Sequence, residues 1–163
     1  MKHLISTLVV NQPGVMIRVA GLFSRRGYNI ESIAVGRSED PNLARIIITV
    51  EAADDRTIEQ IEKQLYKLID VVKVTDLPVA EAVERELALI KVNASGQSRA
   101  EIMQMVNIFR AKIVDVGSRA LIIELTGGTA KVEAFIALLK PYGIREIVRT
   151  GQIAMLRTQR REK

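Results

Sequence analysis

The sequence predicts a mixed α+β fold built from two ferredoxin-like βαββαβ modules in tandem. The first observation is that strand-like and helix-like apolar runs follow one another in the same order in both halves of the chain. The second is a polar segment at residues 77–85, which contains a proline and is typical of a linker. The third is size, because 163 residues of which 48% are apolar can form two small cores. We therefore expect one domain over residues 1–78 and another over residues 79–163.

The first half predicts four strands and two helices from its apolar spacing. The strands are expected at residues 4–10, 30–35, 45–52 and 71–74. One helix is expected over residues 13–26, and Asp55 or Thr57 is expected to cap a second. The inward positions recur at helical spacing. They are Val15, Met16, Val19, Leu22 and Phe23 in the first helix, and Ile58, Ile61, Leu65, Leu68 and Ile69 in the second.

The second half repeats this plan. Strands are expected at residues 87–92, 113–116, 121–125 and 144–148. Ser98 and Glu101 have the spacing of a capping box, which opens a helix with Ile102, Met105, Val106 and Phe109 on its inner face. A second helix over residues 129–139 is stopped by Pro141.

A module of this kind covers only one face of its sheet with helices. The strands carry Ile5, Ile33, Ile46 and Ile48, which are too apolar to leave in contact with water. The open face must then be buried against another surface. We expect self-association through sheet faces or edges, and at least a homodimer.

Composition excludes several classes of site. The chain contains no cysteine, which excludes disulfides, thiolate metal ligands and cysteine nucleophiles and is compatible with a reducing compartment. It has no apolar run of about 18 residues, and its start resembles a strand rather than a signal peptide. We expect a cytoplasmic protein that does not enter a membrane.

The charge distribution raises the alternative of a nucleic-acid-binding module. The net charge of +5 falls entirely in residues 79–163, which include the basic tail at residues 157–163. RNA-binding modules of the same topology stack bases on aromatic residues of their central strands. Residues 3–10 and 45–52 contain no aromatic residue, so nucleic acid is the minor alternative, and the tail is interpreted as a solvated end.

No group of residues has the pattern of a catalytic site. His3 is the only histidine and has no evident partner, so a structural role is expected. Gly127-Gly128-Thr129 is too short for a nucleotide-binding loop. The charges at residues 84–86 are interpreted as a solvated cluster, with a contact to a partner as the alternative. We expect no catalytic residues, no metal site and no bound cofactor in this chain, and an independent enzyme is disfavoured.

The segment from Asn11 to Ile30 predicts a receptor for a free amino acid. Pro13-Gly14 at a helix start leaves backbone N–H groups unpaired and unscreened, which suits a small carboxylate. Asn11 and Asn29 bracket the helix, and each carboxamide both donates and accepts hydrogen bonds. The structural alternative is that both asparagines are turn residues, Gly14 merely starts the helix and Met16 belongs to the core.

The sequence resembles the ACT domain and, more closely, the small regulatory subunits of acetolactate (acetohydroxyacid) synthase. The resemblance rests on Asn11-x-Pro-Gly14 and on the run Arg26-Gly-Tyr-Asn-Ile-Glu-Ser32 in the first half. In the second half it rests on Ile108-Phe-Arg-Ala-Lys-Ile-Val-Asp-Val116 and Glu124-Leu-Thr-Gly127. It covers nearly the whole chain. It implies an N-terminal ACT domain at residues 1–78 and the family's C-terminal domain at residues 79–163.

This resemblance implies a role in valine, leucine and isoleucine biosynthesis. The family's small subunit stimulates a separate catalytic subunit and makes it sensitive to a branched-chain amino acid, usually valine. Thiamine diphosphate, FAD and magnesium are expected in the catalytic subunit and none of them in this chain. The alternative is an ACT-type sensor, or a nucleic-acid-binding regulator, that is not tied to this enzyme.

The resemblance also implies an effector site at a dimer interface. Asn11 and Gly14 of one copy would then face Asn29 and Ile30 of another. The effector carboxylate would accept hydrogen bonds from the N–H groups of Gly14, Val15 and Met16, next to Pro13. Its ammonium would donate to the Asn11 or Asn29 carboxamide oxygen or to a backbone carbonyl. The branched side chain would lie among Val15, Met16 and Ile30.

Overall fold

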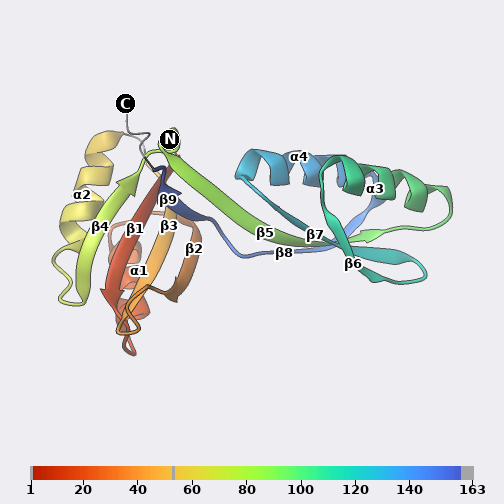
Figure 1. Ribbon diagram of the computed structural model, residues 1–163. Helices are drawn as coiled ribbons and strands as arrows, with labels where there is room; N and C mark the ends of the chain where they lie inside the picture. Colours follow the sequence, from red (N-terminus) through yellow and green to blue (C-terminus); the bar gives the residue numbers. More distant parts are fainter. Residues whose placement is uncertain (1, 53, 159–163) are drawn as a thin grey trace, which may run out of the picture. The chain divides into compact units, whose positions relative to one another are not determined.

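The structure, a computed structural model, describes residues 2–52 and 54–158. Its contacts divide the chain into two compact units (Figure 1). The first unit holds the chain up to Val83 together with the segment from Gln152 onward, and the second unit is Glu84–Gly151. The predicted second domain included residues 152–163, but the described part of that segment, residues 152–158, belongs to the first unit. Residues 159–163 of the basic tail lie outside the described residues.

The first unit has the predicted βαββαβ order. Its strands are β1 (Lys2–Val10), β2 (Ile30–Arg37), β3 (Leu43–Glu51) and β4 (Val71–Leu77), and its helices are α1 (Val15–Arg25) and α2 (Asp55–Leu65). The strands form an antiparallel sheet in the order β2-β3-β1-β4, with both helices on one face (Figure 1).

The second unit repeats this topology. It contains β5 (Ala82–Asn93, which begins in the first unit), α3 (Gln97–Ile108), β6 (Lys112–Val116), β7 (Ala120–Gly127), α4 (Thr129–Leu139), a 3-10 turn (Lys140–Tyr142) and β8 (Ile144–Arg149). Its strands have the order β6-β7-β5-β8, which matches that of the first unit and confirms the predicted fold class, and a fifth strand, β9 (Ile153–Leu156), also pairs with β5. Within the described ranges, no helix is long and apolar enough to cross a membrane.

The core of the first unit lies between the sheet and its two helices. Ile5, Ile46 and Ile48 are at most 1% exposed in this core, and Ile33 packs against it. We had expected these residues on the open face of the sheet, and that expectation was wrong. Side chains alternate along a strand, and these four positions share the face that α1 and α2 cover.

The open face of the first sheet is covered by the returning C-terminal segment, which includes β9 (Ile153–Leu156). Ala154 packs on a small cluster formed by Leu4, Ile47, Leu77 and Ala82. Next to it, Thr49 Oγ1 donates a hydrogen bond of 3.0 Å to the buried Gln152 side chain. Segments far apart in the sequence therefore complete this unit. The predicted linker at residues 77–85 is partly ordered, because Leu77 ends β4 and Ala82 starts β5.

Two predicted helix caps differ from the structure. Asp54, rather than Asp55 or Thr57, caps α2, and its carboxylate accepts a 2.9 Å hydrogen bond from the Thr57 N–H. The capping box at Ser98 does not form, because α3 begins at Gln97 and its N-cap is Gly96. The Ser98 hydroxyl instead donates to the Ser95 carbonyl at 2.7 Å. A glycine with positive φ can start a helix one residue earlier than the side-chain pattern indicates.

The charged residues at 84–86 are not simply a solvated cluster. Glu86 is 3% exposed and receives two hydrogen bonds from the Arg149 guanidinium, at 2.6 and 3.0 Å. Arg149 also donates to Glu133 of α4 at 2.6 Å. The hydrogen bond to Glu86 is the largest of the effects that raise the pKa of Arg149 above its ordinary value. This ion pair joins β5 to β8 where the chain leaves the second unit.

Glu62 provides a test of how α2 packs on the first sheet. Burial of its half-buried carboxyl, and then the charge of Asp76 on β4, raise the pKa of Glu62. A carboxyl whose pKa is higher in the folded than in the unfolded state stabilises the folded state at pH values below the unfolded pKa. This contribution to the free energy of unfolding is lost as pH rises through the folded pKa. We therefore expect Glu62→Gln to raise the thermal midpoint at about pH 8 and to leave it unchanged at about pH 3.

The matched control is Glu59→Gln, one turn earlier on the exposed side of α2. Circular dichroism melting at the two pH values should show little change for this variant, because exposed ion pairs contribute little to stability. An equal shift of the Glu62→Gln midpoint at both pH values would contradict the burial argument.

Candidate functional site

The predicted site begins where β1 passes into α1. Gly14 precedes the helix with φ 87° and ψ −13°, and no side chain caps the helix start. A left-handed conformation of this kind strains any residue with a Cβ atom, which explains the glycine. The first-turn N–H groups of a helix have no partner within the helix. The start of α1 therefore presents polarised N–H groups that can bind an anion.

A buried carboxylate holds this loop in place. Asp70, whose side chain is 3% exposed, lies in the turn between α2 and β4. Its two oxygens accept hydrogen bonds from Gln12 Nε2 at 2.7 Å and from Arg18 Nε at 2.6 Å. Its backbone carbonyl accepts a third, from the Val10 N–H at 2.9 Å. The hydrogen bond from Arg18 lowers the pKa of Asp70, against the opposing effect of burial.

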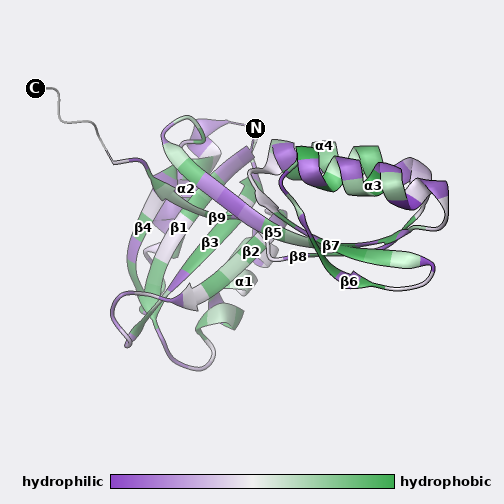
Figure 2. Cartoon of the chain, turned by 45° about the vertical axis from the view of Figure 1, so that its right-hand side comes forward, coloured by the Kyte–Doolittle hydropathy of each residue, from purple (hydrophilic) through white to green (hydrophobic). Residues whose placement is uncertain are grey.

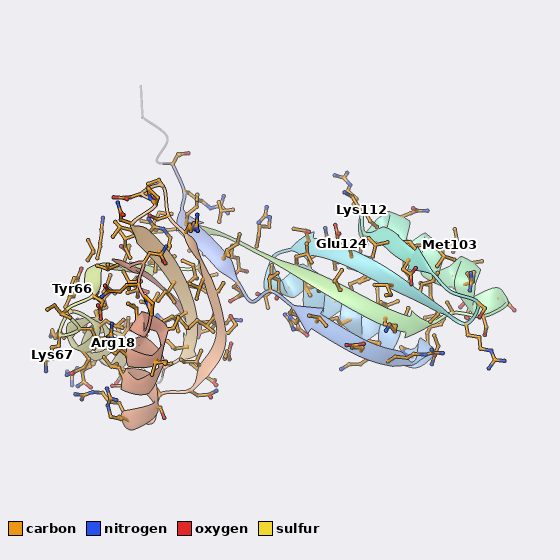
Figure 3. All side chains as sticks on the ribbon, turned by 90° about the horizontal axis from the view of Figure 1, so that it is seen from below. Arg18, Tyr66, Lys67, Met103, Lys112 and Glu124 are labelled. Atoms are coloured by element: carbon orange, nitrogen blue, oxygen red, sulfur yellow. The ribbon has the colours of Figure 1, made fainter. Side chains whose placement is uncertain are left out.

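Arg18 adds a positive charge at the helix start. A Cβ atom placed on Gly14 would lie 3.0 Å from Arg18 Nη1, so the guanidinium lies directly over the glycine. Arg18 projects from α1 in Figure 3. The Arg18 side chain is nearly half exposed. Its ion pair with Asp70 is made through the Nε atom of the guanidinium. The helix dipole and this guanidinium both favour a carboxylate at the same place.

Gln12, Arg18 and Asp70 are not among the site residues predicted from the sequence. The position of Arg18 could have been predicted, because it lies four residues after Gly14 and therefore on the same side of the helix. The role of Asp70 could not have been predicted from local sequence, because its two side-chain partners are 58 and 52 residues away. The turn before Asp70 also differs from the prediction. Ile69, expected on the inner face of the second helix, is 96% exposed because α2 ends at Leu65.

The other predicted residues near the helix start are placed as follows. Asn11 and Pro13 are exposed, and Asn11 Nδ2 donates to the Pro41 carbonyl at 3.4 Å. The Val15 side chain is buried in the first core, so only its backbone faces the loop. Met16 is half-buried at the edge of the same core.

Asn29 and Ile30 lie at the other end of α1. The helix has 11 residues and is therefore about 16 Å long. Asn29 is exposed after the helix, and Ile30 is the first residue of β2, an edge strand of the sheet. One copy of the chain brings Asn11, Pro13, Gly14, Val15 and Met16 together but leaves Asn29 and Ile30 far from them.

Side chains that could hold a metal ion are not clustered in residues 2–52 and 54–158, where no group of three or more His, Asp or Glu has suitable geometry. The histidine of the chain, His3, has its Nε2 buried without a hydrogen-bond partner among these residues. What the first unit offers is recognition chemistry, with N–H donors and a guanidinium at one end of α1 and a carboxamide at the other.

Removing the Asp70 carboxylate should loosen the loop at the start of α1. Asp70→Ala leaves Gln12 and Arg18 without the acceptor that fixes them, and a lost charge-assisted network frees the backbone around it. We expect amide hydrogen exchange of residues 12–18 to accelerate by at least about tenfold. Asp55→Ala, on the exposed first turn of α2, is the control and should leave this segment unchanged. Unaltered protection of the loop in Asp70→Ala would show that the network does not position it.

Two family models match the chain, one over each half. A model described as the AHAS small subunit-like ACT domain matches residues 5–73. A model described as the small subunit of acetolactate synthase matches residues 85–158. Together they cover both structural repeats, in agreement with the resemblance that the motifs indicated.

Individual relatives match over nearly the full length. A protein of Methanothermobacter thermautotrophicus named "Probable acetolactate synthase small subunit" is 55% identical over 97% of this chain and 94% of its own length. The acetolactate synthase small subunit of Mycolicibacterium smegmatis is 49% identical over 97% of this chain and 92% of its own. The crystal structure of the small subunit from Thermotoga maritima has a TM-score of 0.91 and 56% identity, covering 98% of this chain and 99% of that one. The chain therefore belongs to the family of acetolactate synthase small subunits.

Proposed function

We propose that this chain is the regulatory subunit of an acetolactate synthase in branched-chain amino-acid biosynthesis and that it acts in the cytoplasm. It stimulates the catalytic subunit and makes that subunit sensitive to feedback inhibition by valine. Thiamine diphosphate, Mg²⁺ and FAD belong to the catalytic subunit, and the chemistry of the reaction takes place there. The observation that carries this proposal is the uncapped start of α1 at Gly14 with the Arg18 guanidinium over it.

The effector carboxylate binds at this helix start. It accepts hydrogen bonds from the N–H groups of Gly14, Val15 and Met16 and lies next to Arg18. Gly14 is required because a side chain would occupy the space over which the guanidinium lies. Val15 contributes its backbone rather than its side chain, which is buried in the core. A ligand that carries a carboxylate, such as a free amino acid, suits this helix start.

A second copy of the chain completes the site. The ammonium of the amino acid needs an acceptor, and Asn11 Oδ1 lies on the same loop as Gly14. Asn29 Oδ1 and the apolar side chain of Ile30 are about one helix length away in the same copy, so they reach the ligand only from another copy. Met16 and that copy's Ile30 then enclose the aliphatic side chain. Ligand binding thereby depends on assembly, which suits a regulatory subunit.

Isothermal calorimetry of the isolated protein with valine tests the site directly. We expect saturable binding of valine at or below about millimolar concentration, with leucine and isoleucine differing from it by about 10- to 200-fold, because a methylene contributes about 1–3 kcal/mol in an apolar pocket. Absence of binding by all three amino acids at millimolar concentration would refute the proposed function.

Gly14→Asp tests the placement of the carboxylate. The added carboxylate would lie beside Arg18, fill the ligand space and repel the ligand's own carboxylate. We expect valine binding to disappear, and valine inhibition of the reconstituted enzyme with it, while circular dichroism stays that of the wild type.

The control for this substitution is Gly96→Asp. Gly96 also has a positive φ, and a Cβ atom there meets no atom within 4 Å. Its backbone, with φ 54° and ψ −126°, is also strained for a residue with a Cβ atom, so this variant adds a backbone penalty in the second unit without touching the site, and valine inhibition should persist. Normal inhibition in Gly14→Asp would mean that the site is misplaced.

A further inference from the structure

A closed ring of hydrogen bonds lies on the open face of the first sheet, the face away from α1 and α2. The Ser32 hydroxyl donates to Thr49 Oγ1 at 3.0 Å, and the Thr49 hydroxyl donates to Gln152 Oε1 at 3.0 Å. The backbone N–H of Gln152 donates to Ser32 Oγ at 3.4 Å. Each of the two hydroxyls therefore both donates and accepts, and hydrogen bonds linked in this way strengthen one another.

The ring is shielded from water although its members are polar. Thr49 is fully buried, Gln152 is 3% exposed, and Ser32 is half-buried beside them. In the register of the sheet, Ser32 of β2 is the partner of Thr49 of β3. A buried hydroxyl or amide that loses its partner is costly, because water cannot replace the lost hydrogen bond. The three residues therefore hold one another in place.

The ring joins the returning C-terminal segment to the strand that carries one half of the proposed effector site. Ser32 lies on β2, two residues after Ile30 and three after Asn29. Gln152 is the first residue of the returning segment, and it directly precedes β9, which lies against the first sheet (Figures 1 and 2). Ser32 and Gln152 are 120 residues apart, so only the folded first unit brings them together.

Strand β2 is irregular at the point where it carries this half of the site. Its register against β3 shifts between Ile30, which pairs with Val50, and Ser32, which pairs with Thr49. A shift of this kind interrupts the ladder and bends the strand locally. Strand β2 is also an edge strand, so within the described sheet it pairs on one side, with β3. The position of Ile30 therefore depends on how firmly Ser32 is held just after the shift.

We propose that Gln152 and Thr49 are positioning residues for the effector site. Through Ser32 they fix the end of β2 that carries Asn29 and Ile30, and their effect passes through the backbone of this strand. This inference rests on the proposed function, in which Asn29 and Ile30 bind the amino acid. The effector and the docked C-terminal segment then stabilise each other, because both favour the same arrangement of β2 and such a coupling is reciprocal.

Thr49→Val tests the ring, and Thr49→Ser is its matched control. The first substitution removes the buried hydroxyl, whereas the second keeps the hydroxyl and removes a buried methyl group. A general loss of stability would therefore affect both variants, while a broken ring affects only Thr49→Val. In the ligand-free full-length chain, we expect amide hydrogen exchange of residues 30–32 and 152–156 to accelerate at least about tenfold in Thr49→Val and less than about twofold in Thr49→Ser. Equal acceleration in both variants, or none in Thr49→Val, would overturn the proposal.

Calorimetry with free valine then measures the effect on the site itself. We expect Thr49→Val to weaken valine binding at least about tenfold and Thr49→Ser to change it less than about twofold. In the wild-type chain, valine should in turn slow the hydrogen exchange of residues 152–156. Absence of valine binding by the wild type would refute the proposed function, and the positioning role with it. If the wild type binds valine, unchanged binding by Thr49→Val, or exchange of residues 152–156 that valine does not slow, would overturn the positioning role alone.

Discussion

The start of α1 depends on one buried carboxylate. Asp70 receives hydrogen bonds from Gln12 and Arg18 on its side-chain oxygens and from Val10 on its carbonyl, and so ties both sides of the loop to the turn after α2. The network fixes Gly14 before an uncapped helix and holds the guanidinium over it. The proposed preference for an anion therefore rests on the tertiary structure, which places the start of α1 and the Arg18 guanidinium next to each other.

The two repeats of the fold use the same topology for different tasks. In the first, the chain's own returning segment packs on the open face of the sheet, and β2 is an edge strand of that sheet. In the second, the open face keeps aliphatic side chains partly exposed, and Lys91 and Glu146 form an ion pair beside them. On our proposed function, the first repeat senses an amino acid.

Periodicity predicted the order of the elements and most inward positions, because burial of Val19, Leu22 or Ile61 follows directly from helical spacing. Periodicity did not predict the features that depend on contacts between residues far apart in the sequence. Residues 152–158 return to the first unit through contacts such as the hydrogen bond between Thr49 and Gln152, which are 103 residues apart. Likewise, the Glu86–Arg149 pair spans 63 residues, and the Arg18–Asp70 pair spans 52. The ends of α2 were also predicted incorrectly. Asp54, rather than Asp55 or Thr57, caps this helix, and Ile69 lies beyond its last residue.

The central claim is that the effector site is shared between two copies, and subunit complementation tests it most directly. Gly14→Asp and Asn29→Ala copies are each expected to lose valine binding as homodimers. In mixed dimers, one site contains both substitutions and the other contains neither. After subunit exchange in equal amounts, calorimetry should recover about one quarter of the wild-type binding stoichiometry, because about half of the dimers are mixed and each regains one of two sites. A mixture that binds no valine would contradict a shared site.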